Sequence, residues 1–186
     1  MFKLGFKKLY PDAIIPSRST KFSSGLDLCA HNVLKSVSIK RHYNMNIYEV
    51  HDNSLRLLER NIHSLKLNIN ERALIGTGVS VCAFDEYFDV NRIYDIDMQI
   101  RPRSGLGIHF GVHVALGTID SDYNGEIGVI VFNFGAEHFT IIKDQKIAQL
   151  IATPLLCPNS IIELNELPET QRGTLGFGHT DNKTDL

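Results

Sequence analysis

A short acidic segment is the strongest candidate for catalytic chemistry in this sequence. Residues Ile119–Glu126 read IDSDYNGE, which places Asp120 and Asp122 on either side of one serine and Tyr123 directly after them. A carboxylate acts as a general base when it lies within hydrogen-bonding reach of a water molecule. Taken alone, the segment is explained more simply as a solvated hairpin turn, because Asp, Asn and Gly favour that backbone.

Two other segments carry groups that bind phosphate. Arg101–Gly107 combines arginine, serine and glycine, so side chains could donate hydrogen bonds while glycine permits close backbone approach. An ordinary basic turn explains that segment equally well. Near the C-terminus, Phe177 stands among glycines, where an aromatic ring suits stacking on a planar ligand, and Arg172 offers a fork of donors for phosphate.

Taken in order along the chain, five segments resemble the five motifs of the trimeric dUTPases, the dUTP pyrophosphatases. From the first motif to the fifth, the segments are Ser24–Leu28, Pro102–Leu106, Gly117–Glu126, Lys146–Leu150 and Arg172–Thr180. A single match carries little weight, but five in family order, with plausible spacing from the second onward, are improbable by chance. The resemblance extends from Lys3 to Thr180, apart from one insertion.

This resemblance implies an all-β, jelly-roll-like fold and a homotrimer with a swapped C-terminal arm. It implies hydrolysis of dUTP to dUMP and pyrophosphate with Mg²⁺ as cofactor, which keeps uracil out of DNA and supplies dUMP for thymidylate synthesis. We therefore expect a β-domain at residues 1–168, an insertion in it at about residues 35–63, and a mobile arm carrying the fifth motif at residues 169–186.

The third motif supplies the catalytic residue and the base-reading groups that the resemblance implies. Asp120 would orient and activate the water that attacks the α-phosphate. Tyr123 would stack under the deoxyribose and exclude a 2′-hydroxyl. Backbone groups from Val114 to Thr118 would read the uracil edge in a slot too narrow for the thymine methyl. The substrate contacts implied next to Asp120 are Gly117, Thr118 and Ile119.

The other motifs supply the implied phosphate, metal and arm contacts. Ser104 would lie near the bridging oxygen of the leaving pyrophosphate, and Gln149 would contact the phosphates. Asp27 matches the carboxylate that holds Mg²⁺ through water while triphosphate oxygens bind the ion. Phe177 would cap the uracil as the arm closes. The phosphate loop would be Arg103, Ser104 and Gly105, and the arm contacts Arg172, Phe177, Gly178, His179 and Thr180.

The chain departs from the family pattern at several positions. Asp144 occupies a glycine position in the turn before the fourth motif, and because Asp tolerates a left-handed backbone we expect that turn to form. In the arm, Leu175, His179 and Asp181 replace a usual Gly, Ser and Gly, so the resemblance leaves open whether the arm closes with the family geometry.

The largest departure is the insertion at about residues 35–63, which contains His42, His51 and His63. It could be a regulatory surface for an unknown partner, or a weak metal site. A neutral decoration is the simpler explanation, since surface insertions are tolerated at little cost.

Two alternative functions follow from the same resemblance. The dCTP deaminases are similar in fold, but their chemistry needs an Arg and a Glu where this chain has Ile108 and Ile130. The second alternative is a nucleotide-loaded trimer that regulates a partner through the insertion. Asp120 argues against a purely non-catalytic relative.

The elements that must position these residues are mostly strands. Ile96, Met98 and Ile100 alternate with polar residues, the period of a half-buried strand. The runs that predict strands are Phe2–Leu9, Ser64–Ile69, Val79–Phe84, Ile93–Ile100, Glu126–Asn133, Phe139–Lys143 and Ile147–Leu156. One helix is predicted after Asp52 and Asn53, where Leu55, Leu58 and Ile62 recur at helical spacing.

Composition limits the class of protein. A chain of 186 residues with 43% hydrophobic residues suits one domain with a substantial core. A net charge of -2 excludes nucleic acid or an acidic membrane as a partner bound by bulk electrostatics. The cysteines Cys29, Cys82 and Cys157 form no C-x-x-C pair, and no apolar run is long enough to span a bilayer. We expect an intracellular, cytoplasmic protein, with a nuclear or viral origin left open, whose partners are dUTP and its own copies.

Overall fold

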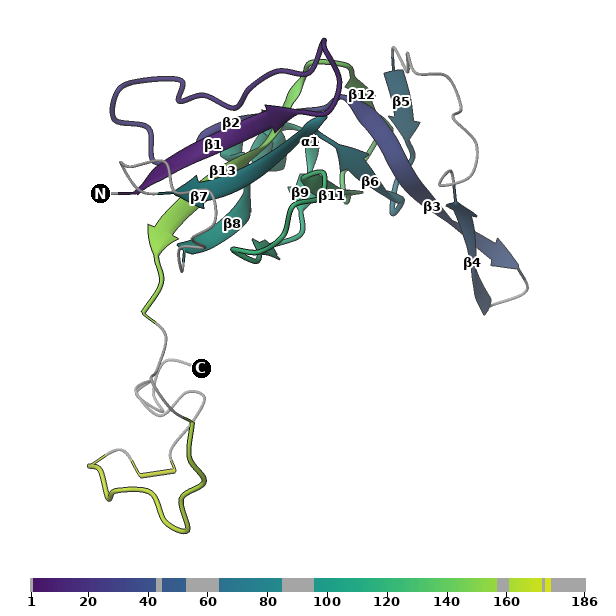
Figure 1. Ribbon diagram of the computed structural model, residues 1–186. Helices are drawn as coiled ribbons and strands as arrows, with labels where there is room; N and C mark the ends of the chain where they lie inside the picture. The colour runs from purple at the N-terminus through teal and green to yellow at the C-terminus, as the bar shows by residue number, and fades with distance from the viewer. Residues whose placement is uncertain are drawn as a thin grey trace. The chain divides into compact units, whose positions relative to one another are not determined.

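The computed structural model describes residues 2–42, 45–52, 64–84, 96–156, 161–171 and 173–174 (Figure 1). The chain forms two compact units, Met1–Leu156 and Cys157–Leu186. The described part of the second unit is exposed, and it contains a turn closed by the Gly173 N–H, which donates to the Thr170 carbonyl at 3.0 Å. The boundary expected at residues 168 and 169 falls within this unit and stays a prediction.

The first unit is built from two large antiparallel sheets and two small ones. The four-stranded sheet has the order β10 (Gly117–Ile119), β8 (Ile96–Pro102), β13 (Lys146–Pro154) and β2 (Leu26–Cys29). The five-stranded sheet has the order β4 (Met45–Asp52), β3 (Asn32–His42), β6 (Arg72–Gly76), β11 (Gly128–Asn133) and β9 (Val112–Val114). The small sheets pair β1 (Lys3–Lys8) with β7 (Val79–Phe84), and β12 (Phe139–Ile142) with β5 (Ser64–Leu67). This confirms the predicted all-β class.

Alternating side chains explain why these segments form strands. In β8, Ile96, Met98 and Ile100 are buried while Asp97 and Gln99 are half-buried. Successive side chains of a strand point to opposite faces of the sheet, so such a sequence buries one face and leaves the other toward solvent. The period-two pattern of this segment therefore predicted its strand correctly.

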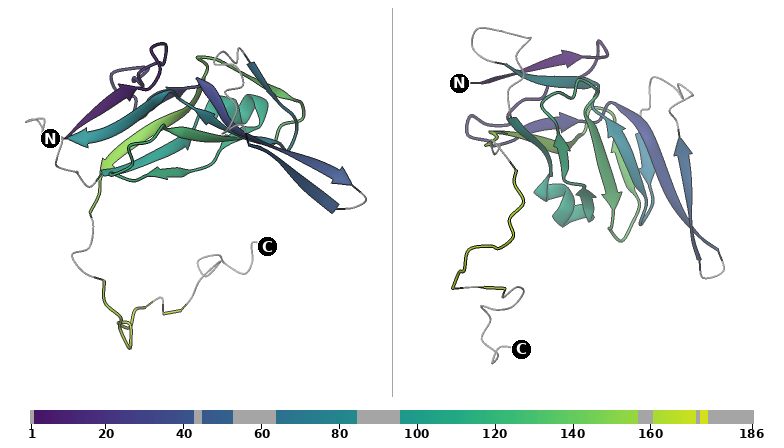
Figure 2. Two further views of the ribbon diagram at one scale, coloured as in Figure 1. Left: turned by 45° about the vertical axis from the view of Figure 1, so that its right-hand side comes forward. Right: turned by 60° about the horizontal axis from the view of Figure 1, so that its bottom comes forward.

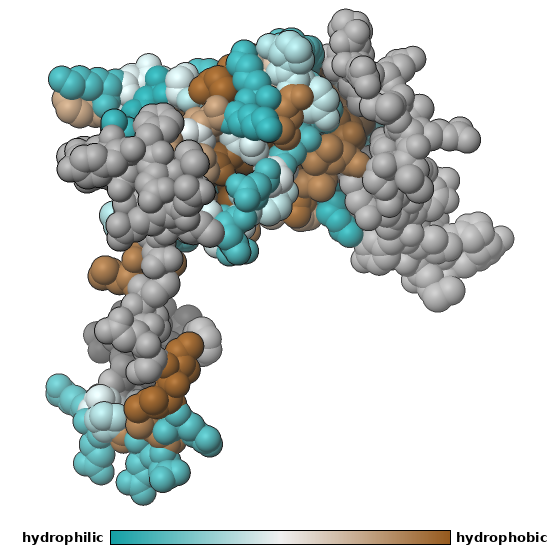
Figure 3. Space-filling model, in the orientation of Figure 1, coloured by the Kyte–Doolittle hydropathy of each residue, from teal (hydrophilic) through white to brown (hydrophobic). Residues whose placement is uncertain are grey.

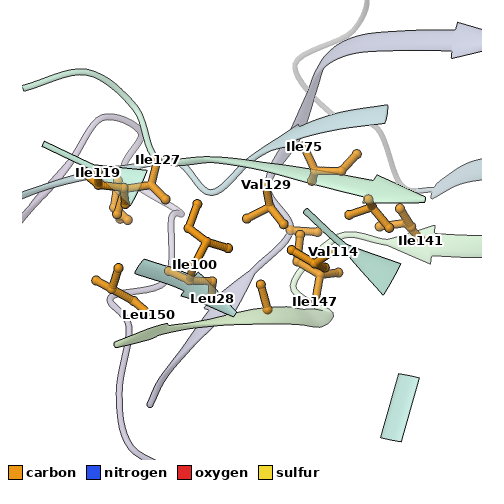
Figure 4. Close-up of a cluster of buried hydrophobic side chains, with 14 of the residues drawn as sticks. Leu28, Ile75, Ile100, Val114, Ile119, Ile127, Val129, Ile141, Ile147 and Leu150 are labelled. Carbon is orange, nitrogen blue, oxygen red and sulfur yellow. The ribbon is translucent and has the colours of Figure 1, made fainter. Parts of the chain in front are cut away.

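The hydrophobic core lies between the two large sheets. Figure 4 shows Leu28, Ile100 and Leu150 of the four-stranded sheet gathered with Ile75 and Val129 of the five-stranded sheet. Met98 and Val129 are 0% exposed, so these side chains lie fully out of water. Burying one such side chain contributes about 1.5–3 kcal/mol, which makes this core the rigid support for the loops at the sheet edges.

A short helix, α1 (Ser104–Phe110), follows β8 directly and was not predicted. It ends at Gly111, whose φ is 65° and whose N–H donates to the Gly107 carbonyl at 3.0 Å. Gly135 lies against Gly111, so a side chain on Gly111 would collide with backbone. The glycine therefore fixes both the end of α1 and its approach to the loop after β11.

The predicted insertion begins inside a core strand. β3 pairs with β6 from Asn32 to Val37 and with β4 from Lys35 to His42. The outer half of the β3–β4 hairpin therefore extends past β6, as Figures 1 and 2 show. Asp52, a suggested helix cap, is the last residue of β4. The helix predicted over Leu55–Ile62 lies outside the described residues.

The turn before β13 has the backbone expected from the sequence. Asp144 has a φ of 65°, and the Gln145 N–H donates to the Ile142 carbonyl at 3.2 Å. The prediction that Asp tolerates this glycine position is thus confirmed.

Several large apolar side chains of the first unit are exposed. Ile108 is 80% exposed, Leu116 68% and Phe134 58%. Figure 3 shows hydrophobic and hydrophilic side chains mixed on one face. Within the described part of the chain, no helix is both long and apolar enough to cross a membrane.

Candidate functional site

The first, second and fourth motif-like segments meet at one pocket. Strand β13 lies between β2 and β8, and Gln149 pairs with Asp27 on one side and Arg101 on the other. Directly paired residues point to the same face of a sheet. The pocket has a volume of about 500 Å³, within the usual range for small-molecule sites. It is lined by Ser19, Ser23, Gly25, Asp27, Arg103, Ser104, Gly105, Leu106, His109, Phe110, Lys146 and Gln149.

Asp27 is the charged centre of this pocket. Its carboxylate is only 8% exposed and forms ion pairs with the guanidinium of Arg103 and, at 2.8 Å, with the ammonium of Lys146. The Ser19 hydroxyl donates to the same carboxylate at 2.5 Å. Burial by itself raises the pKa of Asp27, but the hydrogen bonds from Lys146 and Ser19 and the two positive charges leave the pKa below its ordinary value. Asp27 is therefore ionised at neutral pH.

The start of α1 leaves room for a ligand. A Cβ atom placed on Gly105 would meet nothing within 4 Å, so packing within the chain does not require glycine there. The position instead leaves its backbone open to the pocket. On β13, the Gln149 amide donates to the Pro102 carbonyl at 3.0 Å, and its side chain fills the space that a Cβ on Gly25 would need. Arg103, Ser104, Gly105 and Gln149, all predicted site residues, are thus brought together.

The acidic segment forms a tight turn after β10. The Tyr123 N–H donates to the Asp120 carbonyl at 3.0 Å, and the Tyr123 hydroxyl donates to the Glu126 carbonyl at 3.0 Å. Ser121 is bonded twice to the backbone of Ile96, at 3.0 and 3.1 Å. Asp120 and Tyr123 are exposed, so their side chains are available to a ligand.

Asp120 and the pocket around Asp27 lie at opposite ends of β8. Gly117 pairs with Ile100 and Ile119 with Met98, which puts Asp120 level with Asp97, whereas Arg103 follows the other end of the strand. A strand rises about 3.3 Å per residue, so the levels of Asp97 and Arg103 are roughly 20 Å apart. One chain therefore does not bring Asp120 to its own Arg103.

The described residues fit a magnesium ion only in an indirect role. Among them, no group of three or more His, Cys, Asp or Glu side chains could hold a metal ion. Both Asp27 carboxylate oxygens already contact Arg103, Lys146 or Ser19. A single carboxylate in this setting suits contact through water with an ion that ligand oxygens bind, because Mg²⁺ keeps several of its waters.

Sequence reasoning missed several residues of the pocket. Lys146 is the first residue of the fourth motif-like segment, so its positive charge at the start of a strand could have identified it as a pocket residue. Ser19, Ser23 and His109 had no comparable signal, because their loop and helix positions follow from the fold. The predicted arm residues Arg172, Phe177, Gly178, His179 and Thr180 lie outside the described residues.

The first unit combines an all-β core with a cation-lined pocket and a separate acidic turn, a combination that suits a phosphorylated ligand. The family model for dUTPase matches residues 70–181. The deoxyuridine 5'-triphosphate nucleotidohydrolase of Heliobacterium modesticaldum is 33% identical over 180 residues, covering 96% of both chains. That of Nautilia profundicola is 36% identical over 180 residues, covering 96% of this chain and 98% of its own. The chain belongs to the dUTPase family.

Solved structures show the same fold. A mutant dUTPase of Staphylococcus bacteriophage 80alpha with dUpNHpp has a TM-score of 0.67 at 20% identity and covers 95% of this chain and 96% of its own. A mutant dUTPase from phage phi11 of S. aureus, described with a structural Mg(II) ion, has a TM-score of 0.62 at 18% identity and covers 90% of this chain and 99% of its own. The jelly-roll-like dUTPase fold expected from the sequence is thereby confirmed.

Proposed function

We propose that this chain hydrolyses dUTP at a site shared between subunits of a homotrimer. The reaction of the family is hydrolysis of dUTP to dUMP and pyrophosphate, which limits uracil in DNA and supplies dUMP for thymidylate synthesis. The observation that carries the proposal is the convergence of Asp27, Arg103 and Gln149 from three distant segments on one cation-lined pocket. Fixed donors in such a pocket suit a ligand whose charge lies on phosphate oxygens.

Binding of the triphosphate follows from the pocket walls. Arg103 and Lys146 face the pocket with their charges partly balanced by Asp27, so an incoming phosphate competes with a buried carboxylate for the same cations. Ser104 and the open backbone at Gly105 lie at the start of α1, where they would contact the phosphate groups. Gln149 would hold the phosphate chain from β13.

Catalysis depends on Asp120. Its carboxylate accepts a proton from water as the water oxygen bonds to the α-phosphorus, and the bond from that phosphorus to the bridging oxygen breaks to release pyrophosphate. Ser104 stabilises the departing bridging oxygen. Asp27 would hold Mg²⁺ through water, and the chemistry supplied by the bound ion would be charge neutralisation of the triphosphate.

Recognition of the nucleoside involves the same turn. Tyr123 is 46% exposed, with its hydroxyl tied to the Glu126 carbonyl, so its ring offers a fixed face to the deoxyribose. Backbone groups of Gly117 and Thr118, with Ile119, would read the uracil edge. Phe177 and Gly178 of the arm would close over the base, and Arg172, His179 and Thr180 over the γ-phosphate.

The distance between the turn and the pocket supports a shared site. Groups that act on the same phosphorus must lie within about 3 Å of the reacting atoms, whereas Asp120 and Arg103 of one chain are separated by roughly the length of β8. Exposed apolar side chains such as Ile108, Leu116 and Phe134 are what subunit contacts would cover. A trimer in which one chain supplies Asp120 and another supplies Arg103 meets both requirements.

Release of pyrophosphate from dUTP, dTTP, dCTP and UTP, with and without Mg²⁺, tests this function. The proposal expects hydrolysis of dUTP, faster with Mg²⁺, and rates lower by about 10² or more for the other nucleotides. Equal rates for dUTP and UTP would contradict it, because the Tyr123 face is expected to exclude the 2′-hydroxyl. Deamination of dCTP without pyrophosphate release would favour the deaminase alternative.

A further inference from the structure

Glu126 ties the acidic turn to a distant part of the core. Its carboxylate accepts a hydrogen bond from the Gly78 N–H at 2.7 Å. This bond joins two residues that are 48 positions apart in the sequence. Gly78 is buried and has a φ of 73°. A buried backbone N–H needs an acceptor, so this carboxylate satisfies a group that water does not reach.

The backbone next to Glu126 is fixed to the same segment. The Thr77 hydroxyl and N–H donate to the Ile127 carbonyl at 2.9 and 3.1 Å, and the Ile127 N–H donates to the Val79 carbonyl at 2.9 Å. These bonds anchor the far end of the acidic turn on the link between β6 and β7. The near end of the turn is held by the pairing of β10 with β8 and by the hydrogen bond that the Ile96 N–H donates to the Ser121 hydroxyl.

A second buried polar group faces this carboxylate. A Cβ atom on Gly76 would collide with both Asn32 Oδ1 and Glu126 Oε1, so the two oxygens lie on the same side of that glycine. Asn32 Oδ1 is buried and has no hydrogen-bond partner. A half-turn of the Asn32 amide would bring its Nδ2 donor to the carboxylate in place of the oxygen. In that orientation of the amide, the carboxylate would lie between two donors, the Gly78 N–H and Asn32 Nδ2.

We infer that Glu126 is a positioning residue for the reaction, whose carboxylate clamps the Asp120–Tyr123 turn through Gly78 and Asn32. The inference rests on the proposed function, because it assigns Asp120 and Tyr123 their roles there. Tyr123 transmits the clamp: its hydroxyl donates to the Glu126 carbonyl and its N–H to the Asp120 carbonyl. Loosening Glu126 lets the general base move relative to the substrate, and misplacement by about 1 Å can cost up to 10²-fold in rate.

Steady-state hydrolysis of dUTP by matched variants tests this role. Glu126→Ala removes both acceptors, Glu126→Gln keeps an oxygen for Gly78, and Glu137→Ala removes an exposed carboxylate from the loop before β12 as a control. We expect kcat to fall about tenfold or more in Glu126→Ala, with KM changed less than about threefold, and to stay within about twofold of the parent in the other two. If Glu126→Ala does not fold, Glu126→Asp, which shortens the side chain by one methylene, takes its place with the same expectation.

Hydrogen exchange gives a readout that does not depend on the activity. The Tyr123 amide should exchange about tenfold faster in Glu126→Ala than in Glu126→Gln, because its bond to Asp120 is no longer held. Equal kcat and equal exchange in the alanine and control variants would overturn the inference. A parent that exchanges as expected but does not hydrolyse dUTP would instead overturn the proposed function.

Discussion

Asp27→Asn removes the negative charge from the centre of the cation-lined pocket with almost no change in volume. The carboxylate is 8% exposed, while Arg103 is 32% and Lys146 49% exposed, so the variant leaves two cations close together but partly solvated. Losing one partner of a fully buried pair costs about 3–5 kcal/mol, and of an exposed pair about 0–1. The intermediate burial here gives a loss of about 2 kcal/mol.

Thermal unfolding at fixed protein concentration measures this loss. For a chain of this size, 1 kcal/mol corresponds to about 2–4 °C, so Tm should fall by about 4–8 °C at pH 7.5. Because the folded state lowers the pKa of Asp27, its contribution is present above the unfolded pKa of about 3.9 and is lost as pH falls through the lower folded pKa. The difference in Tm between parent and variant should therefore become smaller as the pH is lowered below about 4.

Pyrophosphate binding separates this electrostatic role from simple packing. Without Mg²⁺, pyrophosphate should raise the Tm of Asp27→Asn more than that of the parent, because Arg103 and Lys146 no longer face a competing carboxylate. With Mg²⁺ the order should reverse, since the variant loses the water-mediated contact to the ion. A Tm within 1 °C of the parent at pH 7.5 (about 0.5 kcal/mol or less), together with identical responses to pyrophosphate, would refute the reasoning.

Three further results are expected. Asp120→Asn should keep dUTP-analogue affinity within about threefold and lose about 10²–10⁴ in kcat, measured by pyrophosphate release; turnover near the parent value would remove Asp120 from the mechanism. Replacing residues 38–49 by Asn-Gly, which joins the paired residues Val37 and Val50 by a two-residue turn, should leave dUTP hydrolysis intact; loss of activity would give the hairpin a role in the site. Phe177→Trp places the only tryptophan in the chain, and its emission should change with a dUTP analogue and much less with a dTTP analogue; an unresponsive spectrum would exclude Phe177 as the cap over the base.

The strands that carry a clear period of two could be predicted from the sequence. Those at β1, β5, β7, β8, β11, β12 and β13 were found within a few residues of their ends. The shorter β9 and β10 have three residues each, too few for a period to show. The period of two is hidden in β3 by a register shift between Val33 and Lys35 and by several cationic residues. The insertion was therefore predicted to begin at about residue 35, although β3 still pairs with β6 as far as Val37.

Helix α1 could not be read from local propensity. Its sequence SGLGIHF contains two glycines, each about 1 kcal/mol less favourable than alanine in a helix, and no side chain caps its start. Its place is set by the end of β8 and by the contact between Gly111 and Gly135. Tertiary structure thus decides the conformation of the segment that carries Ser104 and Gly105.

The candidate site could be predicted as a set of segments, but not as an arrangement. The motif-like spacing identified Asp27, Arg103 and Gln149, and the pairing of β13 with β2 and β8 explains why they meet. The ion pair between Asp27 and Lys146 depends on a register that the sequence does not reveal. The separation of Asp120 from Arg103 along β8 is likewise a property of strand pairing, and it is the observation on which the proposed sharing of the site between chains rests.

Subunit mixing tests the shared site most directly. Asp120→Asn and Arg103→Gln chains should each form inactive trimers, because every site lacks one essential group. When the two are refolded together in equal amounts, about three quarters of the trimers are mixed, and each mixed trimer has one complete site of three. Activity on dUTP should therefore recover to about one quarter of the parent value. Recovery indistinguishable from zero, in samples shown by native mass spectrometry to contain mixed trimers, would contradict a site that takes Asp120 and Arg103 from different chains.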